Sequence, residues 1–159
     1  MAKKKKQSFS DILKKRLKAI KAKDIMTKTV VTIGEDKTLS EVAKIMIKKR
    51  ISGLPVLDKK KKLTGIIVDH DLFLVMDMIE SGNVIEQNSN TKADPKVNYV
   101  MSSQVITIKK DTNLDEIISI MKYKNVHTLP VLQRKKIVGI IGRRDVYQTF
   151  YNAIKNLKK

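Results

Sequence analysis

Two stretches of the sequence are versions of one another and decide its architecture: GLPVLDKKKKLTGIIVDHD at residues 53–71 and TLPVLQRKKIVGIIGRRD at residues 128–145. The run LPVL returns unchanged after 75 positions. One residue is then lost from the lysine-rich connection, so the triplet GII returns after 74 positions. A match this long at a nearly fixed spacing indicates an internal repeat, which has to be recognised before any single motif is interpreted.

The repeat continues upstream of these stretches. Met26 matches Met101, and the β-branched run VVTI at 30–33 matches VITI at 105–108. We therefore divide the chain into a basic tail and helix (1–23), a first repeat (24–82), a polar linker (83–97) and a second repeat (98–159).

Each repeat has the same order of predicted elements. A short β-branched strand (30–33 or 105–108) is followed by an amphipathic helix, whose start is signalled by the capping box TLSE at 38–41 or by NLDE at 113–116. Two strands follow (54–57 and 63–68, or 129–132 and 137–141), joined by a basic turn. A second helix begins near Asp69 or Arg143, and Ser81-Gly82 ends the first of these. The order β-α-β-β-α predicts an α+β fold in which the two repeats pack together as a pair.

Composition excludes several classes of protein. The chain has 159 residues, no cysteine and a formal net charge of +18. It therefore has no disulfide framework, no zinc–thiolate site and no thiol nucleophile. No apolar run reaches the ~18 residues of a membrane span, and the basic start is not followed by the apolar segment of a secretory signal. We expect a cytoplasmic protein.

The charge is concentrated at the N-terminus. Ten of the 34 basic residues lie within residues 1–23, against the single acid Asp11. The stretch from a cap at Ser10 to Lys23 is predicted to be helical, with a narrow apolar stripe at Leu13, Leu17 and Ile20. Such a helix suits an anionic membrane surface, a nucleic acid or a partner groove, or it simply packs its stripe on the domain with lysines outward.

The two repeats together resemble the cystathionine-β-synthase (CBS) domain family, in the tandem form often called a Bateman module. The resemblance covers residues 23–156. It is carried by segments 24–27, 30–33, 53–56 and 63–67 with Asp71, and by segments 99–102, 105–108, 128–131 and 138–141 with Asp145. It implies two CBS repeats related by a pseudo-two-fold axis, a homodimer formed through their helices, and clefts that hold AMP, ADP, ATP or S-adenosylmethionine as a regulatory ligand rather than as an obligatory cofactor.

The resemblance also implies which residues form the clefts. One cleft would combine Met26, Val31, Ile51, Ser52 and Gly53 with Asp145, and the other Met101, Ile106, Val126, His127 and Thr128 with Asp71. The aspartate would bind the ribose hydroxyls, since a carboxylate can accept both. Gly142, Arg143 and Arg144 stand beside Asp145, where arginine is well suited to phosphate.

Two departures from the family pattern distinguish the two expected clefts. The family usually has Thr or Ser three residues before the ribose aspartate, and this chain has Val68 and Gly142 there. Valine removes the hydroxyl and crowds the Asp71 cleft, whereas glycine leaves backbone N–H groups accessible. We therefore expect the Asp145 cleft to be occupied and the Asp71 cleft to be weak, specialised or empty.

Each of these residues also has a plainer interpretation. Asp71 and Asp145 can be acids that complement a helix dipole, His127 can be structural, and the two arginines can face solvent. His70 is expected at the surface, because no metal-ligand spacing accompanies it. No nucleotide-loop, dinucleotide-binding or zinc-protease motif is present, so we expect no enzyme activity and no metal.

The sequence thus predicts a stand-alone regulatory module that senses an adenosine-containing ligand and signals to an unidentified effector protein. One alternative is a basic nucleic-acid-binding protein on the same fold, acting through the N-terminus. Its weakness is the 4% content of aromatic residues, which leaves no evident stacking platform. A ligand-free dimeric scaffold is the third hypothesis.

Overall fold

A computed structural model of the chain describes residues 8–82 and 94–157. It divides into two compact units. The central unit spans residues 30–106, and the terminal unit combines residues 1–29 with 107–159. The lysine tail and most of the predicted linker lie outside the described residues.

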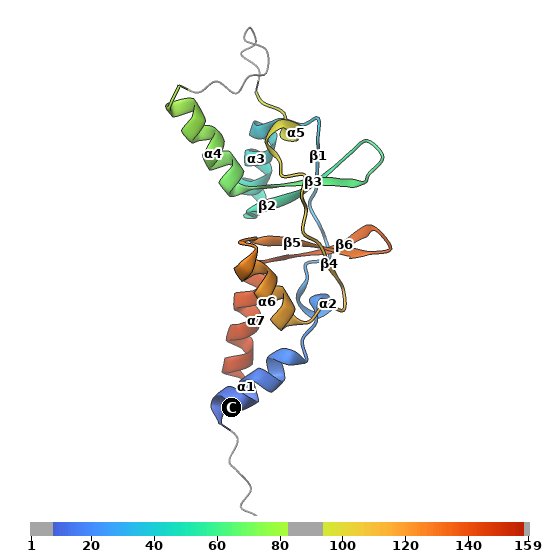
Figure 1. The fold of residues 1–159 in the computed structure, drawn as a ribbon, viewed down its shortest axis with the longest axis vertical. Coiled ribbons are helices and arrows are strands. Elements are labelled where there is room, and N and C mark those ends of the chain that lie inside the picture. The colour runs from blue at the N-terminus through green and yellow to red at the C-terminus, as the bar shows by residue number, and fades with distance from the viewer. Residues whose placement is uncertain (1–7, 83–93, 158–159) are drawn as a thin grey trace, which may run out of the picture. The chain divides into compact units, whose positions relative to one another are not determined.

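Each unit is built around one three-stranded sheet (Figure 1). The central unit contains β1 (Ile33–Gly34), α3 (Leu39–Lys49), β2 (Gly53–Leu57), β3 (Leu63–Val68), α4 (Asp69–Glu80) and α5 (Val97–Val100). The terminal unit contains α1 (Phe9–Lys18), α2 (Ala22–Ile25), β4 (Ile108–Lys109), α6 (Leu114–Tyr123), β5 (Thr128–Gln133), β6 (Lys136–Gly142) and α7 (Arg143–Lys155). In both units the middle strand pairs in parallel with the first strand and antiparallel with the third. This confirms the α+β class and the two predicted repeats.

The two cores use matched positions of the repeat. All of these side chains are at most 7% exposed: Leu39, Val42, Met46, Leu54, Val56 and Ile67 in the central unit, and Leu114, Ile117, Met121, Leu129, Val131 and Ile141 in the terminal unit. On the helices these positions follow a period of 3.6, and on the strands they fall in the short apolar runs.

Each repeat lends its leading segment to the unit of the other repeat. Val97 lies in the core of the central unit, and its counterpart Ala22 is buried in the terminal unit. The first N–H of α3 donates to the carbonyl of Pro95 at 2.9 Å, and the first N–H of α6 donates to the carbonyl of Ile20 at 2.9 Å. Because N–H groups in the first turn have no partner within their helix, these carbonyls serve as caps.

The same segments end on the third strand of each sheet. The backbones of Thr27 and Ile140 exchange two hydrogen bonds, of 2.9 and 3.0 Å, and Ser102 does the same with Ile66 at 2.9 Å. The chain therefore passes between the units twice, and neither unit is one continuous repeat.

The predicted first strands were wrong in extent. Of the residues expected as strands at 30–33 and 105–108, only Ile33 and Ile108 are in strands. A strand needs a ladder partner, and these pair with the middle strand over two residues each, beginning at Val56 and Val131. Their β-branched neighbours have no ladder to join.

The predicted N-terminal helix was also wrong in its bounds. Its cap is Ser8 rather than Ser10, because the Ser8 hydroxyl accepts from the Asp11 N–H while the Asp11 carboxylate accepts from the Ser8 N–H. Helix α1 ends at Lys18 and not at Lys23. The reason is tertiary: the N–H groups of Ala22 and Lys23 donate to carbonyls of the 107–113 segment, at 2.8 and 2.9 Å.

The capping box of α3 forms in part. The Thr38 N–H donates to the Glu41 carboxylate at 3.0 Å, as predicted. The Thr38 hydroxyl also donates to that carboxylate, and it does not accept a hydrogen bond from a backbone N–H of the first turn. Asn113 occupies the N-cap of α6 without a side-chain cap bond. Within the described residues, no helix is long and apolar enough to cross a membrane, and no group of three acidic or histidine side chains could hold a metal ion.

Candidate functional site

A set of backbone and carboxylate hydrogen bonds lies where β6 ends and α7 begins, which we call the Asp145 corner. Thr128, the first residue of β5, pairs with Gly142, the last residue of β6. The N–H of Arg143 donates to the carbonyl of His127 at 3.1 Å. The N–H of Gly142 donates to Oδ2 of Asp145 at 2.7 Å, which fixes the carboxylate over the first turn of α7.

The central unit repeats this backbone arrangement at the start of α4, the Asp71 corner. Gly53 pairs with Val68, and the N–H of Asp69 donates to the carbonyl of Ser52 at 2.9 Å. The N–H of Val68 donates to Oδ2 of Asp71 at 2.7 Å. Both aspartates therefore bond to the backbone N–H at the start of their helices, and each bond occupies one carboxylate oxygen only.

The two corners differ in charge. The residues between the strand and the aspartate are Arg143 and Arg144 in the terminal unit, and Asp69 and His70 in the central unit. Two guanidinium groups favour a phosphate-bearing ligand. A second carboxylate beside Asp71 disfavours phosphate by like-charge repulsion.

The residue three positions before each aspartate differs in the space beside it. Gly142 has φ −100°, an extended conformation that any residue adopts. A Cβ built there would meet its nearest atoms, Oδ2 of Asp145 and the His127 carbonyl, at 3.7 and 4.0 Å, which are ordinary contacts. The corner therefore has room for the family's usual hydroxyl, and glycine is not required by the backbone.

The comparisons with known proteins identify the repeats. A family model for the CBS domain matches residues 22–77 and 97–151, which is more than half of the chain. The chain belongs to the CBS domain family. Both matches begin with the segments that are exchanged between the units, so the CBS sequence repeat and the compact unit are different divisions of one chain.

Its relatives include other CBS pairs. An uncharacterized protein of Methanocaldococcus jannaschii is 40% identical over 128 residues, which are 80% of this chain and 38% of that protein. The CBS domain pair of protein MJ0100, crystallised with 5′-methylthioadenosine and S-adenosyl-L-methionine, has a TM-score of 0.69 and 27% identity over 84% of this chain and 97% of that one. A CBS-domain containing protein from Agrobacterium tumefaciens shares the fold at a TM-score of 0.68 and 22% identity, over 80% of this chain and 91% of that one.

Several of the curated relatives, the first four among them, are much longer than this CBS pair. The chain spans 38% of the first relative and 23 to 24% of the next three. The activities of those whole proteins are thus not properties of the matched region alone.

The predicted site residues divide between the two units. Met26, Val126, His127, Thr128, Gly142, Arg143, Arg144 and Asp145 belong to the terminal unit, and Val31, Ile51, Ser52, Gly53, Asp71, Met101 and Ile106 to the central unit. Within each unit the structure brings together the aspartate and the residues before the middle strand. The assignment of each aspartate to residues of the other repeat stays a prediction from the family.

Two of the predicted cleft residues, Met26 and Met101, have a packing role that the sequence did not indicate. Met26 lies on Gly139 of β6, and Met101 lies on Gly65 of β3. A Cβ at Gly139 would be 2.7 Å from Cγ of Met26, closer than real Cβ atoms come, and 3.0 Å from its Cβ, which is a tight contact. The repeated Gly-Ile-Ile triplet is explained by these methionines, because only glycine leaves them room.

Burial affects the titration of Asp71. It raises the pKa of this carboxyl above its usual 3.8, against the hydrogen bond from Val68, which lowers it. A carboxyl whose pKa is raised by folding favours the folded state while it is protonated, and this contribution is lost as the pH rises through the folded pKa. The ionised Asp71 is therefore retained at a cost in stability.

Asp71→Asn should remove this pH dependence. The amide oxygen can still accept from the Val68 N–H, but no charge is desolvated. We expect the stability of the variant relative to the wild type to increase as the pH rises from about 4 and to level off near neutral pH. Urea denaturation of both proteins at a series of pH values measures this difference. A difference that is constant with pH would contradict the effect of burial on Asp71.

Proposed function

We propose that this CBS pair is a regulatory module that binds an adenine nucleotide, with the Asp145 corner as its principal ribose- and phosphate-binding element. The charge contrast between the two corners carries the proposal. Family membership and the adenosine ligands of the 27% identical CBS pair support it.

The local geometry of Asp145 suits this role. One carboxylate oxygen is held by the Gly142 N–H, and Oδ1 accepts no hydrogen bond from any residue in 8–82 or 94–157. An anchored carboxylate with a vacant oxygen can accept from ribose hydroxyls without losing further side-chain entropy. Arg143 and Arg144 then lie within the same helical turn for the phosphates.

We propose that the Asp71 corner prefers a different class of adenosine ligand from the Asp145 corner. Its two carboxylates disfavour a nucleotide phosphate and are compatible with an uncharged or cationic adenosine compound. The relative with 27% identity was crystallised with two such compounds, 5′-methylthioadenosine and S-adenosyl-L-methionine. We therefore propose that this corner is empty with AMP or ATP, or takes a ligand without phosphate.

A thermal-shift panel tests the function. The probes are AMP, ADP, ATP, S-adenosylmethionine, adenosine and a random oligonucleotide, each at low and high salt. A ligand at 100 times its dissociation constant adds about 2.7 kcal/mol of stability, which raises the Tm of a domain of this size by roughly 5–11 °C. We expect a salt-resistant shift from at least one nucleotide, larger than that from adenosine.

The opposite outcome of the same panel favours the nucleic-acid hypothesis. The exposed lysines of α1 and the net charge of +18 provide for polyanion binding. Binding through released counterions falls steeply as salt increases. Shifts from the oligonucleotide alone that vanish at high salt would replace the sensor proposal with this one.

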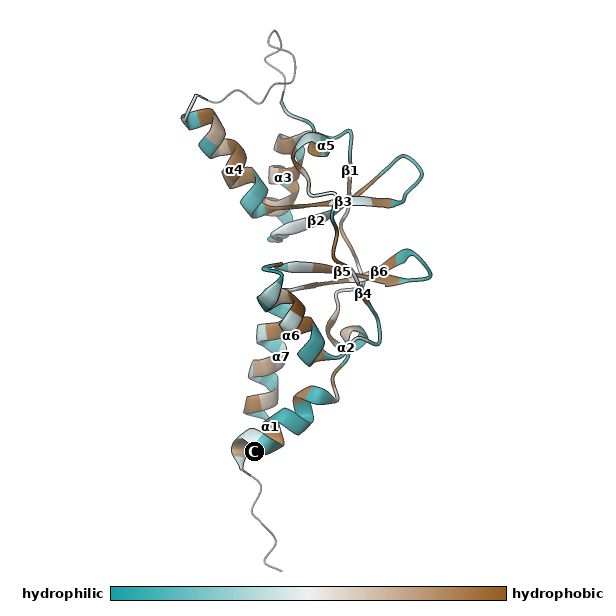
Figure 2. Cartoon of the chain, in the orientation of Figure 1, coloured by the Kyte–Doolittle hydropathy of each residue, from teal (hydrophilic) through white to brown (hydrophobic). Residues whose placement is uncertain are grey.

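We also propose that the module dimerises through α4. Its side chains Phe73, Leu74, Met76 and Ile79 are 49–64% exposed, and Figure 2 shows the helix mostly in hydrophobic colours. Helix α4 has no lysine or arginine, in contrast to the rest of this strongly basic chain. The exposed apolar side chains of this helix, with no lysine or arginine among them, suit a second copy of the same helix. Sedimentation equilibrium gives the mass, and a monomer at all concentrations would contradict the dimer.

The effector protein and the cytoplasmic location remain proposals from the sequence.

A further inference from the structure

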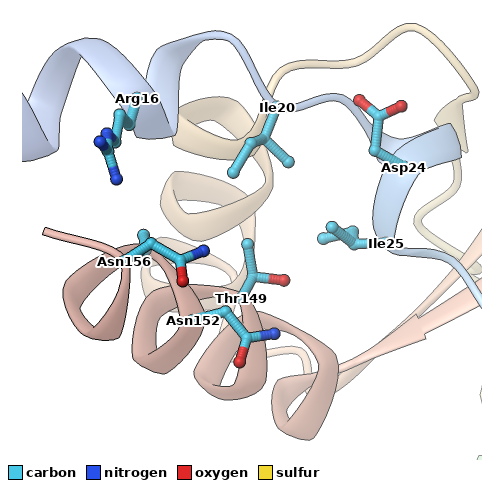
Figure 3. Close-up of a pocket in the computed structure, with 8 residues that line it drawn as sticks. Arg16, Ile20, Asp24, Ile25, Thr149, Asn152 and Asn156 are labelled. Carbon is cyan, nitrogen blue, oxygen red and sulfur yellow. The ribbon is translucent and has the colours of Figure 1, made fainter. Parts of the chain in front are cut away.

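A pocket lies within the terminal unit, away from the strand ends that form the Asp145 corner. Its volume is about 370 Å³, which is in the range of small-molecule pockets. It is open to solvent and bordered by α1, α2 and the C-terminal half of α7 (Figure 3), and it is lined by Arg16, Ile20, Asp24, Ile25, Thr149, Asn152, Ala153 and Asn156.

The wall that α1 and α2 provide is part of the folded unit. The carbonyl of Ile20 accepts from the N–H of Leu114 at 2.9 Å, and the N–H of Ala22 donates to the carbonyl of Thr112 at 2.8 Å. Lys23 forms an ion pair with Asp111 at 3.2 Å. Helix α1 also contacts α6 and α7. Both sides of the pocket are therefore formed by segments that pack within the terminal unit.

The opposite wall is polar where helix packing predicts apolar residues. Thr149, Asn152, Ala153 and Asn156 have the spacing i, i+3, i+4, i+7 and share one face of α7. The first repeat has Val75, Met78, Ile79 and Gly82 at the matched positions. The second repeat thus has a hydroxyl and an amide, at Thr149 and Asn152, in place of two apolar side chains, and a further amide at Asn156 in place of glycine.

The polar groups of the cavity retain hydrogen-bonding capacity. Arg16 and Asn156 extend into it from facing helices (Figure 3). Over residues 8–82 and 94–157, the Arg16 guanidinium makes no ion pair or hydrogen bond. Oδ1 of Asn152 accepts from Gln148 at 3.2 Å, which leaves its NH₂ group to donate. The Thr149 hydroxyl donates to the Asp145 carbonyl at 2.7 Å, so its oxygen can accept.

We propose that this cavity binds a small organic monocarboxylate. The planar guanidinium of Arg16 matches a carboxylate with two parallel hydrogen bonds. Asn152 and Asn156 would bind a hydroxyl, oxo or amino substituent, and the side chains of Ile20 and Ile25 would cover a short apolar body. A single negative charge fits better than a phosphate dianion, because Asp24 and the carbonyl end of α7 lie on the same cavity.

NMR titration of the full chain tests the proposal, with isobutyrate, lactate and 2-oxoisovalerate as probes and isobutyramide as the uncharged control. We expect the acids at up to about 10 mM to shift the methyl signals of Ile20, Ile25 and Ala153, and the amide to have no effect. Arg16→Gln should weaken the binding at least about 10-fold, since hydrogen bonds to a charged group are lost. Lys15→Gln removes the same charge from the neighbouring exposed position and should bind as the wild type does.

A cavity-filling variant completes the test. Asn152→Met introduces the residue that the first repeat has at position 78 and should abolish the acid-induced shifts. AMP binding measured on the same variants separates this site from the Asp145 corner, because neither substitution touches that corner. Absence of shifts with all three acids, or equal affinity of the wild type and Arg16→Gln, would overturn the proposal.

Discussion

Asp145→Ala should lower the affinity for the adenine nucleotide about 10- to 100-fold, whereas Asp71→Ala should leave it nearly unchanged. Hydrogen bonds to a charged group contribute about 1.5–3 kcal/mol, and every 1.4 kcal/mol is a factor of ten in affinity. The two aspartates have the same bond to the preceding backbone, at 2.7 Å in each corner. The difference between them rests on Arg143 and Arg144, which the Asp71 corner lacks.

Isothermal titration calorimetry with AMP and ATP measures this pair of variants. Asp115→Ala is the matched control, because it removes an exposed acid from the first turn of α6 in the same unit. Circular dichroism confirms that each variant is folded. If Asp71→Ala, and not Asp145→Ala, abolished nucleotide binding, the assignment of the principal site would be wrong.

Gly139→Ala should destabilise the protein by about 1–3 kcal/mol, the usual effect of overpacking a filled site. The new methyl group would overlap Met26, whose backbone neighbour Thr27 is held to Ile140 by two hydrogen bonds. These bonds hold the backbone beside Met26 in place, so the new methyl group has to be accommodated by a shift of the Met26 side chain. We expect the Tm to fall by roughly 2–12 °C.

Two further variants isolate the cause. Gly142→Ser adds a side chain to the end of the same strand, where the contacts are ordinary, and it improves an N-cap, so its stability should stay within a few tenths of a kcal/mol of the wild type or exceed it. Met26→Ala combined with Gly139→Ala should be less destabilising than the sum of the single changes, because they share one contact. Additive effects in denaturant titrations would show that Met26 is not the obstacle.

Patterns within a single element were predictive. The capping glutamate Glu41, the start of α4 at Asp69, its end before Gly82 and the matched cores all agree with expectations from residue spacing. These features depend on bonds within four residues or on which face of a helix is apolar. Segments that depend on a distant partner were predicted poorly. The β-branched residues 30–32 satisfy every local criterion for a strand, yet pairing begins only at Ile33.

The pocket of the terminal unit was not predicted for the same reason, since it too depends on segments that are distant in the sequence. Thr149, Asn152 and Asn156 have no significance in a single helix, since polar residues on one face of an amphipathic helix are usual. Their departure from Val75 and Met78 of the first repeat is visible in the sequence. What the sequence does not contain is the fact that α1 and α2 cover that face.

The sequence by itself determined the family, the two repeats and the order of the elements within them, because a repeated hydrophobic pattern specifies the same local structure wherever it occurs. Only the tertiary structure decided that each repeat completes the unit of the other. The segments at 20–27 and 95–102 supply caps, core residues and strand partners across the chain through backbone hydrogen bonds. Such bonds use N–H and carbonyl groups that every residue except proline possesses, so they leave little trace in the residue types. The sequence does reflect these contacts at Gly65 and Gly139, where glycine leaves room for Met101 and Met26.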